Sequence, residues 1–424
     1  MTGREKFFGD GVSAAERSVL SALEGAQGRM TETVLDWSAM NTGSANLDGL
    51  ERMAGILKTS FSALGAEPAL LDPVPVETID GAGEVRTIRR GRNLHLSVRT
   101  QAPVQVLLTG HMDTVFPKDD AFQAATWREP GVLNGPGVAD MKGGLQVMLE
   151  ALKALEASPW AERLGYQVVI NSDEEVSSIG SVALLQDAAS RAHVGLVYEP
   201  ATTPEGVLAG ARKGLAAFTL VARGVSAHAG RDHASGRNAV VAAADFAVRA
   251  AALSGAREGL TINVGRIEGG GPTNVVPDLA LCRLEARVAT HEDRHWVEAE
   301  LARLAAAVGA DHRLTLELNG RFTRPPKPLD ASTQALFEAV AACGAQLGQP
   351  ISWKPTGGCC DGNNLAEAGL PVVDTLGVRG GLIHSRDEFL ITESLVERAQ
   401  LSALLLMRLA AGTIPCPPRI GAAA

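Results

Sequence analysis

Residues 107–115 read Leu-Leu-Thr-Gly-His-Met-Asp-Thr-Val, and the rest of the chain is organised around them. The apolar run 104–108 that leads into this stretch predicts a buried strand. Side chains two residues apart on an extended segment point to the same side, so His111 and Asp113 can face one point in space. That arrangement can hold a metal ion, although the same pair also occurs in ordinary loops.

Length and composition set the class of protein. A chain of 424 residues is longer than a single core usually grows, so about two domains are expected. An apolar content of 46% and a charged content of 21% are typical of a soluble globular protein. The 39 basic and 48 acidic residues give a net charge of -9 without any basic block, so neither nucleic acid nor an anionic membrane is an expected partner.

The amino-terminal segment and the cysteines predict a cytoplasmic protein. Residues 1–10 contain no apolar stretch long enough for a signal peptide, and no uninterrupted span of about 18 apolar residues occurs in the chain. The five cysteines are an odd number without metal-ribbon spacing, as expected of reduced thiols. We therefore expect no disulfide framework.

Apolar periodicity predicts an α/β region that is interrupted by a smaller one. Before Pro200, strands alternate with helices, as in the strand Tyr166–Asn171 and the helix near Ser178–Ala189, which favours a largely parallel sheet. Four strands and two helices in about 110 residues then predict a small α+β sandwich. The proline-rich segment 324–328 marks the return, because proline cannot continue a ladder or a helix interior. The predicted division is 1–206 and 324–424 for the two parts of the first domain, and 207–323 for the inserted domain.

Acidic and imidazole side chains recur where the predicted strands end. In an open α/β sheet the carboxyl ends of the strands form the ligand-binding edge, so these groups should gather at one rim. Two imidazoles and three carboxylates make a set of metal donors: His111, Asp140, Glu175, Glu199 and His384. If Asp140 bridges, the set can hold two divalent ions, and its donors suit zinc, with cobalt or manganese as substitutes. Ions about 3.5 to 4 Å apart lower the pKa of bound water toward ~7, which suits hydrolysis.

The adjacent Glu174 and Glu175 cannot normally share one role, because neighbouring side chains diverge. We assign Glu175 to the metal and Glu174 to the proton, which it would take from water and deliver to the leaving nitrogen. Asp113 would then orient His111 through the other ring nitrogen. A solvated acidic loop is the alternative for the glutamate pair considered alone.

Six segments, in order between about residues 35 and 412, carry a resemblance to a known family. They are Gly-His-Met-Asp-Thr-Val at 110–115, Gly-Val-Ala-Asp-Met-Lys-Gly-Gly at 137–144, Asp-Glu-Glu at 173–175, Tyr-Glu-Pro at 198–200, Ser-Ala-His-Ala-Gly at 226–230 and His-Ser-Arg-Asp-Glu at 384–388. These segments resemble the motifs of the dizinc aminoacylase family, which includes acetylornithine deacetylase, succinyl-diaminopimelate desuccinylase, aminoacylase and bacterial glutamate carboxypeptidase. The resemblance implies a zinc-exopeptidase-like α/β catalytic domain with a mostly parallel central sheet, interrupted by a small α+β sandwich for dimerisation.

The same resemblance distributes the donors between two zinc ions. It implies two sets that share a carboxylate, with His111, Asp140 and Glu199 in the first and Asp140, Glu175 and His384 in the second. It also implies that Glu174 is the general base and that a cis peptide bond follows Asp140.

Four residues match substrate-contacting positions of the family. His228 matches a histidine that reaches across a homodimer to the substrate, and Asn274 matches an asparagine that contacts it. Arg287 interrupts an apolar strand and matches an arginine that grips a substrate carboxylate with two N–H groups. At Arg324 the sequence resembles the glutamate carboxypeptidase branch of the family, and this arginine could hold a second acidic group of the substrate. The alternative is that Arg324 is a solvated residue before Pro325. Both arginines together favour a C-terminal acidic amino acid.

One segment departs from the family pattern. In Gly-Gly-Cys-Cys-Asp at 357–361, Cys360 stands where the family usually has serine or threonine. The vicinal pair of Cys359 and Cys360 could be a redox or inhibitory site, but we expect two inert thiols.

The predicted function is that of a cytoplasmic, homodimeric dizinc hydrolase. It would cleave an amide bond next to a free carboxylate in a small-molecule substrate, as glutamate carboxypeptidase does. An N-acyl-amino-acid deacylase of the deacetylase or desuccinylase type is the alternative within the enzyme class. A non-catalytic binding protein on the same scaffold is the alternative outside it, and the intact donor set together with Glu174 argues against that alternative.

Overall fold

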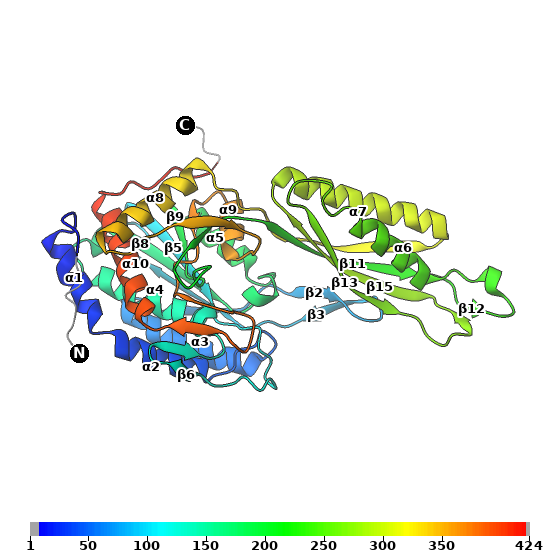
Figure 1. Ribbon diagram of the computed structural model, residues 1–424, viewed down its shortest axis with the longest axis horizontal. Helices are drawn as coiled ribbons and strands as arrows, with labels where there is room; N and C mark the ends of the chain where they lie inside the picture. Colours follow the sequence, from blue (N-terminus) through cyan, green and yellow to red (C-terminus); the bar gives the residue numbers. More distant parts are fainter. Residues whose placement is uncertain (1–7, 421–424) are drawn as a thin grey trace.

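The computed structural model describes residues 8–420 and shows a large and a small body placed end to end (Figure 1). The large body contains elements from both ends of the chain, whereas the small body is built from its middle part. The molecule is therefore elongated.

A six-stranded sheet forms the centre of the large body. Its order is β1 (Ala69–Leu71), β4 (Asn93–Val98), β8 (Leu164–Asn171), β5 (Val104–His111), β9 (Val194–Val197) and β18 (Val372–Val373). The last four strands run parallel to one another, whereas β4 is antiparallel to β8 and β1 is antiparallel to β4. The predicted α/β class with a mostly parallel central sheet is confirmed.

Helices cover both faces of this sheet, which explains why its strands are apolar at successive positions. On β5, Leu108 faces one core and Leu107 faces the other. The first face packs against α4 (Gly144–Glu156) and α10 (Glu393–Ala411), and the second against α5 (Val182–Ser190) and α9 (Asp361–Glu367). Further helices of the large body are α1 (Ala14–Glu24), α2 (Gln27–Ser38), α3 (Leu47–Phe61) and α8 (Ala331–Gln346).

Short strands and turns complete the large body. The strands are β10 (Leu208–Arg212), which pairs with β17 (Trp353–Thr356), and a small sheet of β19 (Gly380–Gly381), β20 (Phe389–Ile391), β7 (Val132–Asn134) and β6 (Thr126–Glu129). The turns are η1 (Ser62–Leu64), η3 (Ala161–Arg163), η4 (Glu174–Val176) and the π turn η2 (Val138–Gly143). Within η2 the Asp140-Met141 peptide bond is cis, as the resemblance implied.

The small body is a four-stranded antiparallel sheet with two helices on one face. The sheet order is β13 (Thr261–Gly269), β15 (Leu279–Val288), β11 (Gly214–Arg223) and β16 (Thr315–Arg324), and the helices are α6 (Ala239–Ala251) and α7 (His291–His312). Alternate residues of β11, such as Phe218 and Leu220, point into the core shared with the helices. This is the arrangement expected of an α+β sandwich, while the domain boundaries at 207 and 323 stay a prediction.

The far end of the small body carries a short hairpin. Strand β12 (Ala227–His228) pairs with β14 (Val275–Val276), and the turn η5 (His233–Ser235) lies beside them. Figure 1 shows β12 at the end of the molecule opposite the large body. We refer to this hairpin and its flanking residues, 226–238 and 270–277, as the tip.

A second hairpin joins the two bodies. Strands β2 (Val76–Ile79) and β3 (Val85–Ile88) reach from the large body onto the helix-free face of the small sheet (Figure 1). Arg283 donates a hydrogen bond of 2.9 Å to the carbonyl of Ile79, and Arg223 donates one of 2.8 Å to that of Gly83. The hairpin therefore fastens the large body to strands β15 and β11.

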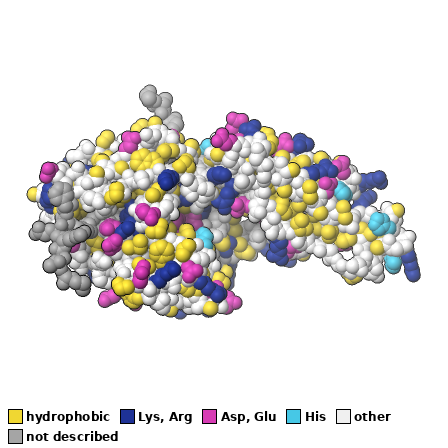
Figure 2. Space-filling view, viewed as in Figure 1, with side chains coloured by type: hydrophobic (Ala, Val, Ile, Leu, Met, Phe, Trp, Pro, Cys, Tyr) yellow, Lys and Arg dark blue, Asp and Glu magenta, His cyan; other side chains and the backbone are white. Residues whose placement is uncertain are grey.

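Within residues 8–420, no helix has the length and apolar character needed to cross a lipid bilayer. On the face seen in Figure 2, acidic and basic side chains are intermixed over both bodies.

Candidate metal centre

Three parallel strands end at one rim of the central sheet and bring acidic or imidazole side chains to it. His111 is the last residue of β5, the turn η4 with its two glutamates follows β8, and Glu199 follows β9. Asp140 reaches the same rim from η2, and His384 reaches it from the loop between β19 and β20. The carboxyl ends of parallel strands share one edge, which explains the convergence.

Asp140 stands between two groups of donor atoms. Its Oδ1 lies 3.1 Å from Nε2 of His111, and the same nitrogen lies 3.7 Å from Oε1 of Glu199. Its Oδ2 lies 3.2 Å from Nε2 of His384, which is also 3.2 Å from Oε2 of Glu175. In each group of three, the ligand atoms lie within 4.8 Å of one another. The structure thus assembles the five predicted ligands into the two predicted sets, with one oxygen of Asp140 facing each.

The charges in this cluster favour bound cations. Burial, together with the charge of Asp140, raises the pKa of Glu175 to about 7, and burial also raises the pKa of Glu199. Burial alone would lower the pKa of His111, but Glu199 and the hydrogen bonds to Asp113 and Asp140 raise it well above its usual value. Buried carboxylates that repel one another are stabilised by cations between them. The donor set therefore fits two divalent ions.

Asp113 is fully buried and orients two parts of the site. Nδ1 of His111, the ring nitrogen that faces away from the donor sets, lies 3.0 Å from the backbone carbonyl oxygen of Asp113 and 3.4 Å from its Oδ1. The two carboxylate oxygens of Asp113 accept hydrogen bonds from the backbone N–H groups of Glu174 at 3.1 Å and Glu175 at 3.2 Å, and one accepts a 2.7 Å bond from the Ser44 hydroxyl. This geometry suits the orienting role predicted for Asp113, and it shows that Asp113 also holds η4.

Glu174 lies beside the two donor sets without belonging to either. Its Oε1 accepts a hydrogen bond of 2.8 Å from Nη2 of Arg324. Burial raises the pKa of Glu174 well above its usual value, and the charge of Arg324 opposes this rise. A carboxylate with a raised pKa can both accept and return a proton near neutral pH. The surroundings of Glu174 therefore suit proton transfer.

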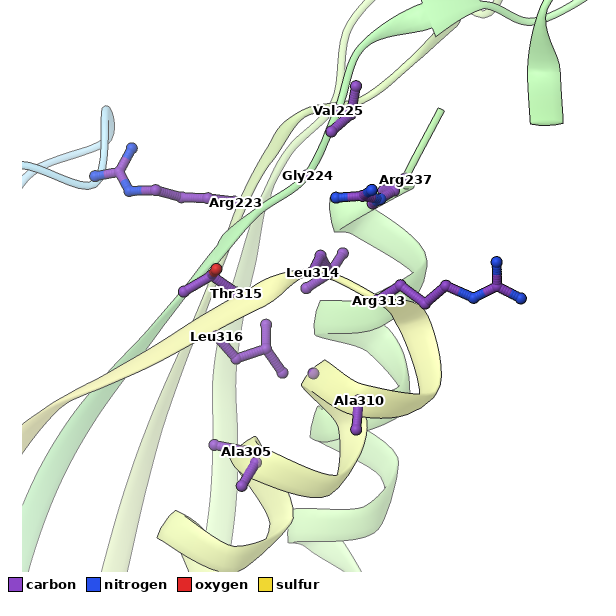
Figure 3. Close-up of a pocket in the computed structure, with 12 residues that line it drawn as sticks. Arg223, Gly224, Val225, Arg237, Ala305, Ala310, Arg313, Leu314, Thr315 and Leu316 are labelled. Atoms are coloured by element: carbon purple, nitrogen blue, oxygen red, sulfur yellow. The ribbon is translucent and has the colours of Figure 1, made fainter. Parts of the chain in front are cut away.

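A pocket of about 560 Å³ opens at the donor sets, between the two bodies. A volume of this order suits a small molecule. A second hollow, of about 680 Å³, lies in the small body among β11, β16 and α7, and Figure 3 shows the arginines at its edge. That hollow contains no donor residue, so we assign the site to the first pocket. Its lining includes Asp140, Glu174, Glu175, Glu199, Arg287 and His384.

Residues 107–408 match the peptidase family M20/M25/M40. The chain belongs to this family. Among its M20 relatives, carboxypeptidase G2 of Pseudomonas sp. (strain RS-16) is 27% identical over 377 residues, which cover 88% of this chain and 87% of that protein. Succinyl-diaminopimelate desuccinylase of Cereibacter sphaeroides is 33% identical over 311 residues, which cover 66% of this chain and 76% of that protein.

Solved structures share the M20 fold of this chain. Aminopeptidase PepT from Bacillus cereus superposes with a TM-score of 0.69 at 23% identity, covering 91% of this chain and 99% of that chain. The M20 family metallo-carboxypeptidase Sso-CP2 from Sulfolobus solfataricus gives a TM-score of 0.68 at 16% identity, covering 90% of this chain and 99% of that chain. Family membership and the clustered donors make this M20 chain a metal-dependent hydrolase, and the non-catalytic alternative is not retained.

The predicted substrate-contacting residues lie in two places. Arg287 and Arg324 line the pocket. Arg324 is only 2% exposed, so the alternative of a solvated residue is wrong. His228 and Asn274 are exposed and lie in the tip, away from the pocket of their own chain. A single chain therefore does not bring these last two residues to its metal centre.

Glu388 is a buried residue to which sequence reasoning gave no role. Its carboxylate accepts hydrogen bonds from the backbone N–H groups of Gly137 at 3.1 Å, Ala139 at 2.9 Å and Asp140 at 3.0 Å. It thus fixes the turn that carries the shared Asp140. The available signal was its position at the end of the His-Ser-Arg-Asp-Glu segment, 384–388, whose first residue belongs to the same donor set.

The unusual Cys360 has a structural role at the start of α9. It is the N-cap residue, and its Sγ accepts a hydrogen bond of 3.3 Å from the backbone N–H of Gly362. A serine or threonine hydroxyl would accept the same bond. Burial raises the pKa of the thiols of both Cys359 and Cys360, which disfavours the reactive thiolate form.

Proposed function

We propose that this chain is a dizinc hydrolase that cleaves an amide bond next to a free carboxylate, in the manner of a glutamate carboxypeptidase. The observation that carries the proposal is the position of Glu174, outside both donor sets and within a small pocket that also presents Arg287. The similarity to carboxypeptidase G2 supports it. Zinc is proposed because the donors are imidazole and carboxylate, with cobalt or manganese as substitutes.

Each residue has a stated part in this reaction. Divalent ions at the two donor sets would supply positive charge that acidifies water and polarises a carbonyl group. Glu174 takes a proton from the attacking water and delivers it to the leaving nitrogen. Asp113 keeps His111 and η4 in position, and Arg287 holds the substrate carboxylate so that the scissile amide lies at the rim.

The proposal includes a homodimer in which His228 and Asn274 of one subunit complete the pocket of the other. Their exposure in the tip, away from their own pocket, supports this arrangement. Strand β13 is an edge strand, and the exposed backbone groups of an edge can pair with a second chain. Apolar side chains are exposed on β13 and the neighbouring α6: Ile267 is 45% exposed, Val241 50% and Val248 72%.

A substrate panel tests the reaction class. Peptidyl and N-acyl amino acids would be assayed with added zinc, cobalt or manganese, each beside a matched compound whose terminal carboxylate is an amide. We expect turnover of the free carboxylates and little turnover of the blocked compounds, because Arg287 loses its partner. Equal turnover of both would contradict the proposal.

The variant Glu174→Gln tests the base. It should lose about 10²–10⁴-fold in turnover, because the amide cannot accept the proton, while its bound metal stays unchanged. A Glu174→Gln enzyme that keeps most of its activity would contradict the assignment.

An N-acyl-amino-acid deacylase is the second candidate, favoured by the 33% identity to succinyl-diaminopimelate desuccinylase. The two candidates differ in the group on the acyl side of the bond. A kcat/KM that is higher for N-succinyl or N-acetyl amino acids than for dipeptides and other peptidyl amino acids would favour the deacylase.

A further inference from the structure

Arg324 is the last residue of β16, at the point where the chain returns from the small body to the large one. The pairing of β16 with β11 is irregular there, because Leu215 pairs with Arg324 whereas the next residue, Ala216, pairs with Phe322. The extra residue, Thr323, forms a bulge. Bulges redirect side chains and occur beside active sites. The side chain of Arg324 consequently enters the large body and is almost completely buried.

Both terminal nitrogens of Arg324 are bound to protein acceptors. Nη2 donates to Oε1 of Glu174 at 2.8 Å, to Oγ of Ser178 at 2.8 Å and to the Glu174 carbonyl at 3.1 Å. Nη1 donates to the Ser177 carbonyl at 3.1 Å and lies 3.1 Å from Oδ1 of Asp361. A substrate carboxylate needs a terminal nitrogen that is free to donate to it, and both terminal nitrogens of Arg324 are already engaged.

Arg287 differs from Arg324 in this respect. Its Nε donates to Glu285 and its Nη1 to the carbonyl of Gly357, both at 2.6 Å. Its side chain is 31% exposed, and its Nη2 has no hydrogen-bond partner within residues 8–420. Arg287 can therefore receive a substrate group without giving up its protein contacts.

The acceptors around Arg324 form a connected network behind Glu174. The hydroxyl of Ser178 accepts from Arg324 and donates to Oδ1 of Asp361 at 2.6 Å. The amide of Asn171, the last residue of β8, donates to Oδ2 of the same aspartate. Glu174 is thus connected through Arg324 to the buried end of the central sheet. Such networks fix the rotamer of the side chain that they hold.

We propose that Arg324 is a positioning residue that fixes the carboxylate of Glu174 in the pocket, and that it is not a receptor for a substrate carboxylate. This inference rests on the proposed role of Glu174 as the base. Of the two arginines, only Arg287 then recognises the substrate carboxylate. Removal of Arg324 should therefore slow turnover and leave substrate binding nearly unchanged.

The experiment compares kcat and KM for Arg324→Lys and Arg324→Ala, using substrates with one carboxylate and with two. The lysine keeps the charge but cannot bridge Glu174 and Asp361 together, so kcat should fall about tenfold in Arg324→Lys and about 10²-fold in Arg324→Ala. KM should stay within about threefold for both kinds of substrate, with metal content unchanged. If Arg324→Ala does not fold, Arg324→Lys decides the test.

A double variant separates positioning from general structural damage. In the Glu174→Gln background, Arg324→Lys should cause no further loss of turnover, because the group that it positions is already inactive. A further loss of the same size as in the wild type would overturn the proposal. A KM that rises mainly for substrates with two carboxylates, with kcat retained, would also overturn it and restore the receptor role.

The failure of this inference can be distinguished from failure of the proposed function. If Glu174→Gln retains turnover, the base assignment fails and the positioning role fails with it. If Glu174→Gln is inactive but Arg324→Lys keeps the wild-type kcat, only the positioning role is overturned.

Discussion

The rim of the central sheet and the tip of the small body differ in what one chain can complete. At the rim, five donors from separate segments lie close enough together to form two sets around Asp140. At the tip, His228 and Asn274 match substrate-contacting positions but lie away from their own pocket. The order of parallel strands is sufficient to assemble the rim, whereas we propose that the tip contributes through a second copy. The fold of one chain forms the rim, whereas the tip would reach a pocket only in the dimer that we propose.

Removal of the metal ions from the donor sets at the rim is expected to have the largest effect, a complete loss of enzymatic activity. In the metal-free protein, hydrogen bonds to Asp140 and Glu175 raise the pKa of His384 to about 11, so its imidazole is protonated at neutral pH. A metal ion binds only the neutral ring and must displace this proton. The affinity of the protein for zinc should therefore fall about tenfold for each unit by which the pH falls and for each proton displaced. Zinc titration of the chelator-treated protein between about pH 6 and 8 measures this. A pH-independent affinity would contradict the role of His384.

Mixed dimers test whether the tip of one subunit serves the rim of the other. His228→Ala alone should lower turnover by about 10²-fold, because it removes a hydrogen-bond donor from the developing oxyanion. Glu174→Gln subunits keep an intact tip. An equal mixture of the two variants should therefore recover about a quarter of the wild-type activity, through the one complete site of each heterodimer. Heterodimers that form without recovering activity would show that His228 does not act across the dimer.

Substitution of Arg287 should have a smaller effect that appears in substrate binding. Arg287→Ala removes a charge-assisted hydrogen bond, so KM should rise by about 10- to 10²-fold with kcat nearly unchanged. Arg303→Ala is a matched control, because Arg303 is an exposed arginine of the same small body, on α7, with a side chain 62% exposed, outside the pocket. Equal changes in KM for the two variants would indicate a general charge effect.

Cys360→Ser should have the smallest effect. A serine hydroxyl can accept the hydrogen bond from Gly362 that caps α9, so turnover should stay within about twofold of the wild type. Thermal unfolding and steady-state kinetics check this. A large loss of turnover in a folded Cys360→Ser protein would show that the thiol itself takes part in function.

The rim could be predicted because each of its donors is marked by a local sequence pattern, and this pattern recurs along the chain. The strand predicted at Tyr166–Asn171 is found as β8 (Leu164–Asn171), since burial on both faces gives a continuous apolar run. Each donor follows such a run or a recognisable turn. The β2–β3 hairpin gave no such signal, because most of its side chains are exposed and no core periodicity marks it.

The partners of Arg324 could not be predicted from its neighbours in sequence. The bulge that redirects it depends on the pairing of β16 with β11, and its acceptors come from η4 and α9. An arginine before a proline is therefore equally compatible with a solvated, a substrate-binding or a positioning role until the tertiary contacts are known. The position of the tip relative to a pocket is likewise not encoded in any one segment.

The β2–β3 hairpin has a mechanical consequence for the enzyme. The main chain passes between the two bodies at neighbouring points, where Arg212 and Lys327 pair, and two adjacent crossings alone would act as a hinge. The hairpin adds a further attachment away from that axis, through the bonds of Arg223 and Arg283. A rotation of the small body relative to the hairpin would stretch or break these bonds. The stiffness of the hinge, and with it the width of the cleft during turnover, therefore depends on residues that never touch the substrate.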